Sequence, residues 1–458
     1  LTHLERLNIS RTAIVNLNYL STLSNVKILN LDSNRVADIT ALKGMKNLEE
    51  LYINHTLVSN LSSLQELAQL KRIYCDHSRI NQSTAEAFMA LRPQVLVIFD
   101  SEDLRSWWAT LSHDWRTLFQ QAGGISKDPT KEELARVIKL DSINLDNTAI
   151  TDLEPLRRFS KLKVLIASHT SVADLKPIEV LEAITYLDVS HSMVYDLSAM
   201  ARWKSLRALM ANHTPVQNLP SALQHPTLEK LYLNGTGIDD NAVKYFLDKN
   251  PKCLVVYKSE QLNQWWGGLS KEWKSIFTIQ LGVNEGSTEV LHRLIEGEEL
   301  HFQDTDVDDL TALNVFIRLK HIQFSSTRIT DLSPLSNHRY LMSLHATQSP
   351  LTNIDVVAAL PRLEELNISN TPIDDIDVLR NMQQLKKLNC SGTPLRRLNA
   401  LEGLSGLMYL DCSNTLVRNL NPVANISLGV LKCYNTKVSS RKIAEFKQGN
   451  PECEVVYY

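Results

Sequence analysis

Residues 362–385, RLEELNISNTPIDDIDVLRNMQQL, contain one complete copy of a 22-residue unit from which most of the chain is built. Its pattern is LxxLxLxxTxIxxL, with serine also allowed at the ninth place and valine at the eleventh. The ninth place falls at Thr12, Asn34, Thr56, Ser78, Thr148, Thr170, Ser192, Thr214, Thr236, Thr305, Thr327, Ser349, Thr371, Thr393, Thr415 and Thr436. A fixed period of this length is typical of stacked repeats that bury their apolar faces against one another. The sequence therefore predicts a repeat array and not a conventional globular enzyme.

Charge and hydropathy exclude several classes of partner. The 458 residues include 48 basic and 51 acidic residues, giving a formal net charge of −3, and they contain no long basic run. Nothing therefore indicates nucleic acid or anionic lipid as a partner. No apolar stretch approaches the roughly 18 residues of a membrane-spanning helix, so we expect no transmembrane segment. Residue 1 falls inside a repeat, so we expect a mature or trimmed fragment whose sequence leaves its location open.

The six cysteines are placed as buried thiols and not as a disulfide framework. Two stand at matching places in block ends and four at the sixth place of the unit: Cys253 and Cys453, then Cys75, Cys390, Cys412 and Cys433. Other units have inward-pointing aliphatic residues at that sixth place. Side chains on neighbouring parallel strands point the same way, which is poor geometry for a disulfide. Reduced cysteines weakly favour a reducing compartment and leave secretion open.

The units fall into three blocks separated by two copies of a different module. The sequence predicts block one over residues 1–101, block two over 139–259 and block three over 296–458. The two helical modules are predicted at 102–138 and 260–295. Each block ends in a helix-like stretch and a short apolar strand, which we interpret as a longer last repeat covering the open end of the core.

The two modules contain six of the seven tryptophans. They read SEDLRSWWATLSHDWRTLF at 101–119 and SEQLNQWWGGLSKEWKSIF at 259–277, offset by 158 residues. Apolar residues recur at helical spacing, and three N-caps and two helix ends are predicted: Ser112, Ser270 and Thr130, then Gly123 and Gly282. The amphipathic spacing favours helical caps that bury the rings against the next block. The alternative is a stacking platform for sugar or peptide formed by the paired tryptophans.

The repeats resemble leucine-rich repeats, of the 22-residue type in the bacterial internalin-like and SDS22-like groups. Residues 318–338, RLKHIQFSSTRITDLSPLSNH, show the likeness as clearly as residues 362–385. One departure is consistent, because the usual asparagine of the ninth place is threonine or serine in 15 of 16 units. The resemblance implies an α/β, right-handed solenoid with a parallel concave sheet and short convex helices or turns, in three blocks joined by the small helical modules. The three blocks separated by tryptophan-bearing helical segments also resemble large multi-block repeat proteins of bacteria, several of them surface-exposed, so a bacterial cell-surface or secreted location is expected.

In this solenoid, the third, fifth and seventh places of each unit point to the concave surface and supply the candidate binding residues. Block two is the most apolar there, with Val164, Ile166, Tyr186, Ala208, Met210 and Tyr232. Smaller sets are Tyr52, Tyr74 and Arg72 in block one, and Tyr409 and Tyr434 in block three. Clustered apolar residues that face solvent are typical of contact sites, and tyrosine and arginine are favoured at protein interfaces. The alternative is that these side chains pack against one another or under a neighbouring block.

Two other residue types recur in the units and are candidate functional groups. Histidines at the eighth place, His55, His77, His169, His191 and His213, would stack one unit apart, and three imidazoles could hold a metal ion. Neither carboxylate nor cysteine joins them in register, so we predict no metal and no cofactor, only loop histidines that repel one another below about pH 6.5. The acids before each convex turn, Asp38, Asp152, Asp174, Asp196, Asp331 and Asp375, are predicted to be turn and helix caps.

These observations predict a non-enzymatic protein, because no nucleophile, base and orienting group converge in register. The leading hypothesis is a binding protein that recognises a protein or peptide on the concave face, centred on block two. One alternative is a carbohydrate or cell-wall binder that uses the tryptophan modules, and buried Trp107 and Trp265 rings would count against it. Another alternative is an intracellular scaffold that regulates an enzyme, as the resemblance to SDS22-like proteins implies.

Overall fold

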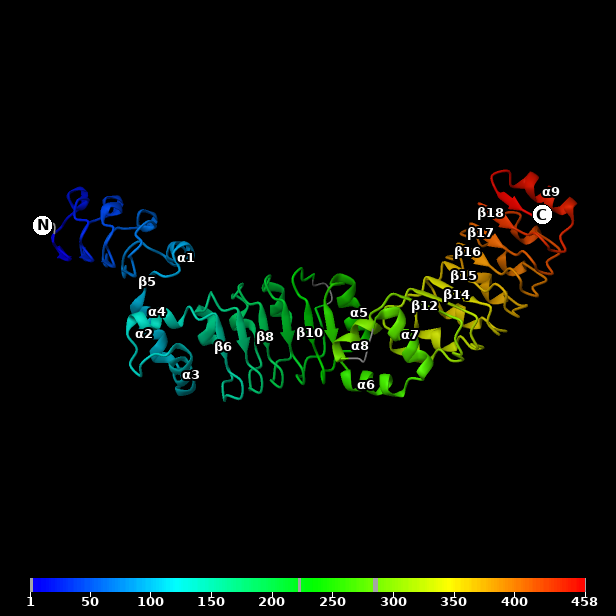
Figure 1. Cartoon of the computed structure of the whole chain (residues 1–458), viewed down its shortest axis with the longest axis horizontal. Coiled ribbons are helices and arrows are strands. Elements are labelled where there is room, and N and C mark those ends of the chain that lie inside the picture. Colours follow the sequence, from blue (N-terminus) through cyan, green and yellow to red (C-terminus); the bar gives the residue numbers. More distant parts are fainter. Residues whose placement is uncertain (1–2, 221–223, 283–286, 458) are drawn as a thin grey trace. The chain divides into compact units, whose positions relative to one another are not determined.

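The computed structural model describes residues 3–220, 224–282 and 287–457. It divides into two compact units, Leu1–Glu229 and Lys230–Tyr458. Figure 1 labels their helices and strands. The division falls inside the predicted second block, so the five-part division of the chain stays a prediction.

The first unit contains nine short parallel strands among its described residues. One sheet holds, in sequence order, β1 (Arg6–Asn8), β2 (Ile28–Asn30), β3 (Glu50–Tyr52), β4 (Arg72–Tyr74) and β5 (Leu96–Ile98). A second row holds β6 (Ser142–Asn144), β7 (Val164–Ile166), β8 (Tyr186–Asp188) and β9 (Ala208–Met210). Neighbouring strands of repeats pair in a register of 22 residues, for example Leu165 opposite Leu187.

The second unit continues the same construction. Strand β10 (Lys230–Tyr232) pairs with β11 (Leu254–Val256). An eight-stranded parallel sheet then runs in sequence order through β12 (Glu299–Gln303), β13 (His321–Ser325), β14 (Ser343–Thr347), β15 (Glu365–Asn367), β16 (Lys387–Asn389), β17 (Tyr409–Asp411), β18 (Val430–Lys432) and β19 (Glu454–Val456). Each repeat strand begins at the third place of its unit, so all 16 predicted units are confirmed as strand-forming repeats.

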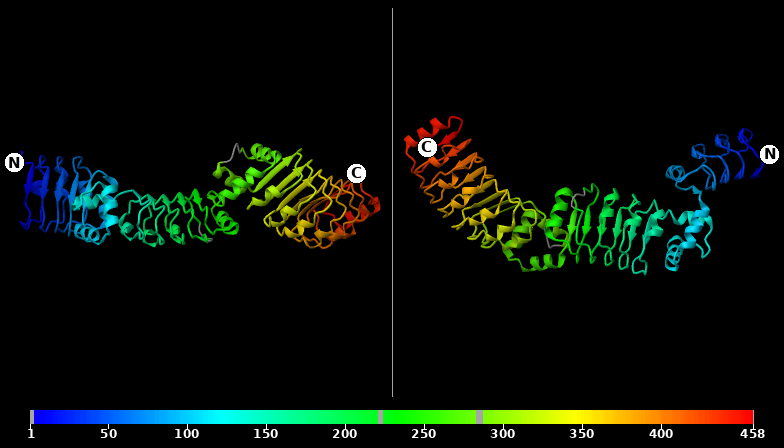
Figure 2. Two further views of the ribbon diagram at one scale, coloured as in Figure 1. Left: turned by 90° about the horizontal axis from the view of Figure 1, so that it is seen from below. Right: turned by 180° about the vertical axis from the view of Figure 1, so that it is seen from behind.

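Opposite each row of strands, the chain makes short 3-10 helices, such as η4 (Glu154–Arg158) and η7 (Thr311–Val315) (Figure 2). The predicted acidic caps stand directly before them. Asp38 Oδ1 accepts the Thr40 amide at 2.8 Å, and Asp331 Oδ1 accepts the Ser333 amide at 2.8 Å. Four other aspartates likewise accept the amide of the residue two positions later: Asp152, Asp174, Asp196 and Asp375. The interpretation of these carboxylates as turn caps is confirmed.

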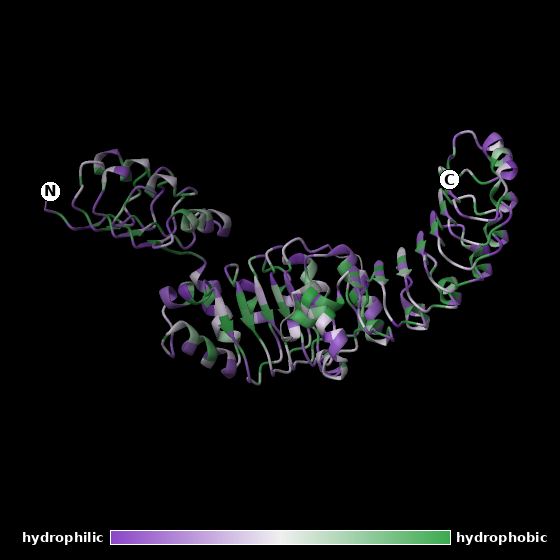
Figure 3. Ribbon diagram, turned by 45° about the vertical axis from the view of Figure 1, so that its right-hand side comes forward, coloured by the Kyte–Doolittle hydropathy of each residue, from purple (hydrophilic) through white to green (hydrophobic). Residues whose placement is uncertain are grey.

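The core lies between the strands and the 3-10 helices, where the leucines of the pattern are buried. Figure 3 shows hydrophobic residues, in green, along the strands. The hydroxyls of the ninth place help to satisfy the backbone there. Thr170 and Thr371 donate to carbonyl oxygens of Ala167 and Ile368, each at 2.7 Å and each within one unit. Asn34 instead reaches two units, since its Nδ2 donates to the carbonyls of Leu31 at 3.0 Å and Ile9 at 2.8 Å. The Asn34 Oδ1 also accepts the amides of Thr12 at 3.0 Å and Ile14 at 3.1 Å, so a hydroxyl that donates once within its own unit replaces only part of the asparagine's bonds.

Longer helices lie at the ends of the predicted blocks and within the two predicted modules. The block ends carry α1 (Gln82–Leu91), α5 (Asp240–Lys249) and α9 (Ser440–Gly449), each followed by the last strand of its row. The first module consists of α2 (Ser101–Thr110), α3 (His113–Gly123) and α4 (Lys131–Val137). The second consists of α6 (Ser259–Gly268), α7 (Lys271–Leu281) and α8 (Thr288–Ile295).

The predicted caps of the module helices are largely confirmed. Ser112 and Ser270 cap α3 and α7, and Thr130 caps α4 in a capping box with Glu133. Gly282 follows α7 in a left-handed conformation as predicted. The end of α3 is one residue later than predicted, because Gly124, and not Gly123, takes the left-handed conformation, at φ 57°.

Candidate functional site

The apolar row of the predicted second block lies on adjacent strands of the first unit. Val164, Tyr186 and Ala208 are in register on β7, β8 and β9. Two residues further along each strand, Ile166 and Met210 flank Asp188 in the same manner. All five apolar side chains are half-buried, and burial raises the pKa of Tyr186. We call this surface the β7–β9 face.

Tyr232 belongs to the second unit and is engaged there by the second module. Its hydroxyl hydrogen-bonds with the carboxylate of Glu289 on α8. Lys230 Nζ, on the same strand, donates to the two oxygens of Glu289 at 3.0 and 2.9 Å. Hydrogen bonds from Tyr232 and then Lys230 lower the pKa of Glu289. The ring is half-buried, and its polar end ties α8 to β10.

In block one, Tyr74 does not lie on an open surface as expected. The side chains of Tyr52 and Tyr74 stack with ring centroids 4.3 Å apart, but Tyr74 is only 4% exposed. The reason is helix α4, whose Lys131 places its ammonium 4.7 Å from the Tyr74 ring centroid. Arg72 pairs with Glu50 at 2.7 Å. The expectation of an exposed Tyr74 is therefore wrong, because the module covers this end of the sheet.

The two candidate tyrosines of the predicted third block lie on or next to its strands. Tyr409 and Tyr434 are both half-buried, and Lys432 Nζ lies 5.5 Å from the Tyr409 ring centroid. Hydrogen bonding with Tyr409 raises the pKa of Lys432. The role of Tyr409 and Tyr434 in binding stays a prediction.

The eighth-place histidines form two stacks. The His55 and His77 rings are 4.5 Å apart, and the His169, His191 and His213 rings follow one another at 4.5 Å. Burial first, and then the charges of His213 and His169, lower the pKa of His191. Within the described residues, no cluster of three or more histidine, cysteine or acidic groups could hold a metal ion. All six cysteines are buried free thiols.

The tryptophans of both modules pack against the first repeat of the block that follows, as the amphipathic spacing predicts. In the first module, Trp107 lies with its ring centroid 5.5 Å from Phe119 and 6.1 Å from Phe159. In the second, Trp265 lies 5.7 Å from Phe277 and 6.4 Å from Phe316. Trp107, Trp115 and Trp273 are buried, and Trp108, Trp265 and Trp266 are half-buried, which counts against a stacking platform of open rings.

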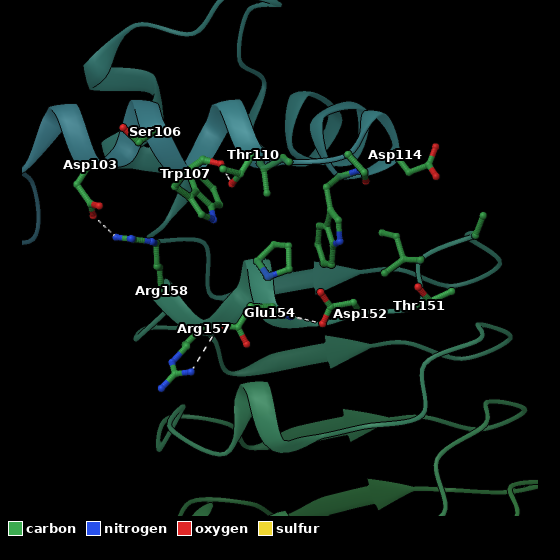
Figure 4. Close-up of a pocket in the computed structure, with 16 residues that line it drawn as sticks. Asp103, Ser106, Trp107, Thr110, Asp114, Thr151, Asp152, Glu154, Arg157 and Arg158 are labelled. Carbon is green, nitrogen blue, oxygen red and sulfur yellow. Dashed lines mark hydrogen bonds and ion pairs between the residues drawn. The ribbon is translucent and has the colours of Figure 1, made fainter.

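The two modules differ in how their indole N–H groups are satisfied. Trp265 Nε1 donates to the carbonyl of Ala312 at 3.1 Å, and Trp273 Nε1 donates to that of Asp309 at 3.1 Å. Trp107 Nε1, at the place equivalent to Trp265, is buried and has no hydrogen-bond partner among the described residues. The Trp107 ring lines a hollow of about 900 Å³ between α2, α3 and residues 149–158 (Figure 4).

Sequence reasoning missed the role of the third module helix. Glu132 of α4 and Glu289 of α8 occupy equivalent positions, and the charges of both raise the pKa of the tyrosine beneath, Tyr74 and Tyr232, after the effect of burial. The shared letters are a serine or threonine cap followed two residues later by glutamate, in both modules. A comparison of the two modules that included their third helices could therefore have predicted that a glutamate of each lies near a strand tyrosine.

Comparison with known proteins gives the fold alone. No protein-family model matches the sequence, and none of the curated proteins matches it. Among solved structures, an internalin (inlF) from Listeria monocytogenes is similar at 19% identity, covering 95% of this chain and 86% of that chain, with a TM-score of 0.26. A leucine-rich-repeat protein from Leptospira interrogans is similar at 13% identity over 99% and 96%, with a TM-score of 0.29.

A third similar structure is the leucine-rich-repeat ectodomain of the Arabidopsis thaliana receptor kinase GASSHO1/SCHENGEN3 in complex with CASPARIAN STRIP INTEGRITY FACTOR 2. Its identity is 11%, the coverage is 97% of this chain and 57% of that chain, and the TM-score is 0.31. The repeat pattern and the parallel strands establish the chain as an α/β leucine-rich-repeat solenoid. Among the described residues, none of the helices is long and apolar enough to span a membrane.

Proposed function

We propose that this leucine-rich-repeat chain is a non-enzymatic binding protein that recognises a protein or peptide partner on the β7–β9 face. The observation that carries the proposal is the in-register row of half-buried apolar side chains on three adjacent strands. Strands in a sheet are about 4.8 Å apart, so Val164, Tyr186 and Ala208 form one continuous apolar strip, with Ile166 and Met210 beside it. A strip of this kind gains free energy when a partner removes it from water.

Polar groups surround the strip and would give the contact its specificity. Asp188 lies between Ile166 and Met210 on the strand register, and Ser190 lies beyond it, bonded to the Asn212 amide at 3.3 Å. An apolar centre with a polar rim is the usual anatomy of a protein interface. Tyr186 and Met210 are the expected anchors, since tyrosine and methionine are enriched at interface centres. Bacterial origin and a cell-surface location remain part of the proposal.

The experiment compares two double variants of the full chain in pull-downs from host and same-organism extracts, followed by affinity measurement with the purified partner. Tyr186→Ala/Met210→Ala truncates the anchors on the β7–β9 face. Met193→Ala/Tyr195→Ala removes the same two side-chain types from the loop of the same repeat, where they are 58% and 64% exposed. If Tyr186 and Met210 are binding hot spots, their truncation should lower the affinity of the first variant by about tenfold or more. Equal affinity of the two variants for the partner would contradict the proposal.

A further inference from the structure

The hollow beside Trp107 combines a buried donor without a partner with a lining that is rich in carboxylates. Trp107 is 9% exposed, and its Nε1 has no hydrogen-bond partner among the described residues. Figure 4 shows the indole between the module helices and η4, the 3-10 helix that carries Glu154 and Arg158. An unsatisfied buried donor costs free energy, because it has lost its bond to water. The hollow of about 900 Å³ is within the range of small-ligand sites.

The second module shows which acceptor group can pair with an indole N–H at this place. At the equivalent place, Trp265 Nε1 donates to the main-chain carbonyl of Ala312 at 3.1 Å. The chain therefore satisfies one indole with its own peptide carbonyl and leaves the other without one. A carbonyl oxygen from another molecule would complete the first module in the same manner.

The rim of the hollow selects for positive charge. Asp103, Asp114, Asp152 and Glu154 line it together with two arginines. Both arginines are already paired, Arg158 with Asp103 and Arg157 with Glu154. Asp114 and Asp152 have no ion-pair partner in the part of the chain that the structure describes. Two unpaired carboxylates at a hollow favour a cationic group of the ligand.

We propose that this hollow binds an extended peptide with a basic side chain, whose main-chain carbonyl accepts the Trp107 indole N–H. A sugar is the weaker fit, because its usual contact is an open aromatic face, and Trp107 and Trp115 are only 9% and 4% exposed. The site lies between α2, α3 and the repeat at residues 149–158, whereas the β7–β9 face lies on the strands. The two proposals therefore stand on different residues and can fail separately.

The test is an NMR titration of the ¹⁵N-labelled full chain, read at the indole N–H signals of its seven tryptophans. The probes are Ac-Gly-Arg-Gly-NH₂, Ac-Gly-Glu-Gly-NH₂ and N,N′-diacetylchitobiose, and the Trp107 signal is assigned as the one lost in Trp107→Phe. We expect the arginine peptide alone to move this signal downfield in a saturable manner. Tyr186→Ala/Met210→Ala should leave the titration unchanged.

Matched variants separate the hydrogen bond from general packing. Trp107→Phe, followed at the neighbouring Trp115 signal, should weaken binding of the arginine peptide about three- to tenfold, the size of one hydrogen bond. Trp265→Phe removes an N–H that is used internally and should leave the affinity unchanged, whereas Asp114→Asn/Asp152→Asn should weaken it. Equal shifts with both peptides, a shift with the sugar alone, or no shift, as expected of a site that holds only water, would each overturn the proposal.

Discussion

At the residue scale, the eighth place of each unit is set by backbone conformation. His55, His169 and His191 have φ values of 53°, 50° and 56°, and Gly235 and Gly392 take the same place at 67° and 73°. The left-handed region is open to glycine and, among other residues, best tolerated by asparagine, aspartate and histidine. The histidine rows are therefore explained by backbone geometry, with no need for a ligand.

A substitution at His191 tests this explanation. His191→Val places a β-branched side chain at φ 56° and should lower the free energy of unfolding by about 1–2 kcal/mol. His191→Asn should change it by less than about 0.5 kcal/mol, since asparagine tolerates this conformation. Urea unfolding of the two variants at pH 8 measures the difference. Equal stability of both variants would show that stacking, and not φ, sets the residue type.

A second residue-scale effect concerns Glu296, which is partly covered and whose carboxylate accepts the Val255 amide at 3.2 Å. Burial raises its pKa from 4.5 to about 7. The folded state therefore holds a proton that the unfolded state has released, and stability present below pH 4.5 is lost as pH rises through about 7. His338 has the opposite sign, since burial lowers its pKa from 6.5 to about 4, and its cost appears as pH falls through this window.

Glu296→Gln isolates the carboxyl contribution, because glutamine keeps an acceptor for Val255 and does not titrate. Each pKa unit corresponds to about 1.4 kcal/mol, so the shift from 4.5 to about 7 amounts to about 3 kcal/mol. The stability of the variant relative to wild type should rise by this amount between pH 4 and pH 8. Urea unfolding across this range measures it, and a constant difference would contradict the assigned burial.

At the element scale, the module helices show what a sequence can and cannot predict. Ser112, Ser270 and Thr130 were predictable caps, because a cap depends on residues within four positions of one another. The covering of Tyr74 by α4 was not predictable, since helical spacing shows that a helix has an apolar side but not which sheet surface it meets. The β7–β9 face was predictable from strand alternation, whereas the difference between Trp107 and Trp265 depends on how each indole packs against the next repeat, which their shared sequence pattern does not show.

Helix α4 offers an element-scale prediction with a built-in control. Thr130 accepts the Glu133 amide and belongs to a capping box, whereas Ser287, its counterpart before α8, makes no side-chain cap bond. Thr130→Ala should destabilise α4 by about 1 kcal/mol, and Ser287→Ala should leave α8 nearly unchanged. Hydrogen exchange measured by mass spectrometry should rise about fivefold in residues 131–137 of the first variant. A comparable rise in residues 288–295 of the second variant would contradict the difference in capping.

At the scale of the whole molecule, each of the two compact parts of the chain is a nearly one-dimensional stack of 22-residue repeats. Leu388 on β16 lies in register with Leu366 and Leu410 on the neighbouring strands, and all three are at most 1% exposed. In such a stack, a repeat transmits strain only through its immediate neighbours. Binding at the β7–β9 face would on this basis be insulated from changes in the sheet of β12–β19.

Two leucine truncations test this insulation. Leu388→Ala should cost about 2–5 kcal/mol locally, because it leaves a cavity in a closely packed core. Hydrogen exchange should rise in β15, β16 and β17 and remain unchanged in residues 3–220. Leu165→Ala, at the equivalent place on β7 and also 0% exposed, should raise exchange in β6 to β8 and leave β12–β19 unchanged. Increased exchange throughout the chain after either substitution would mean that the stack unfolds as one cooperative body, and that a contact at one sheet could be felt at the other.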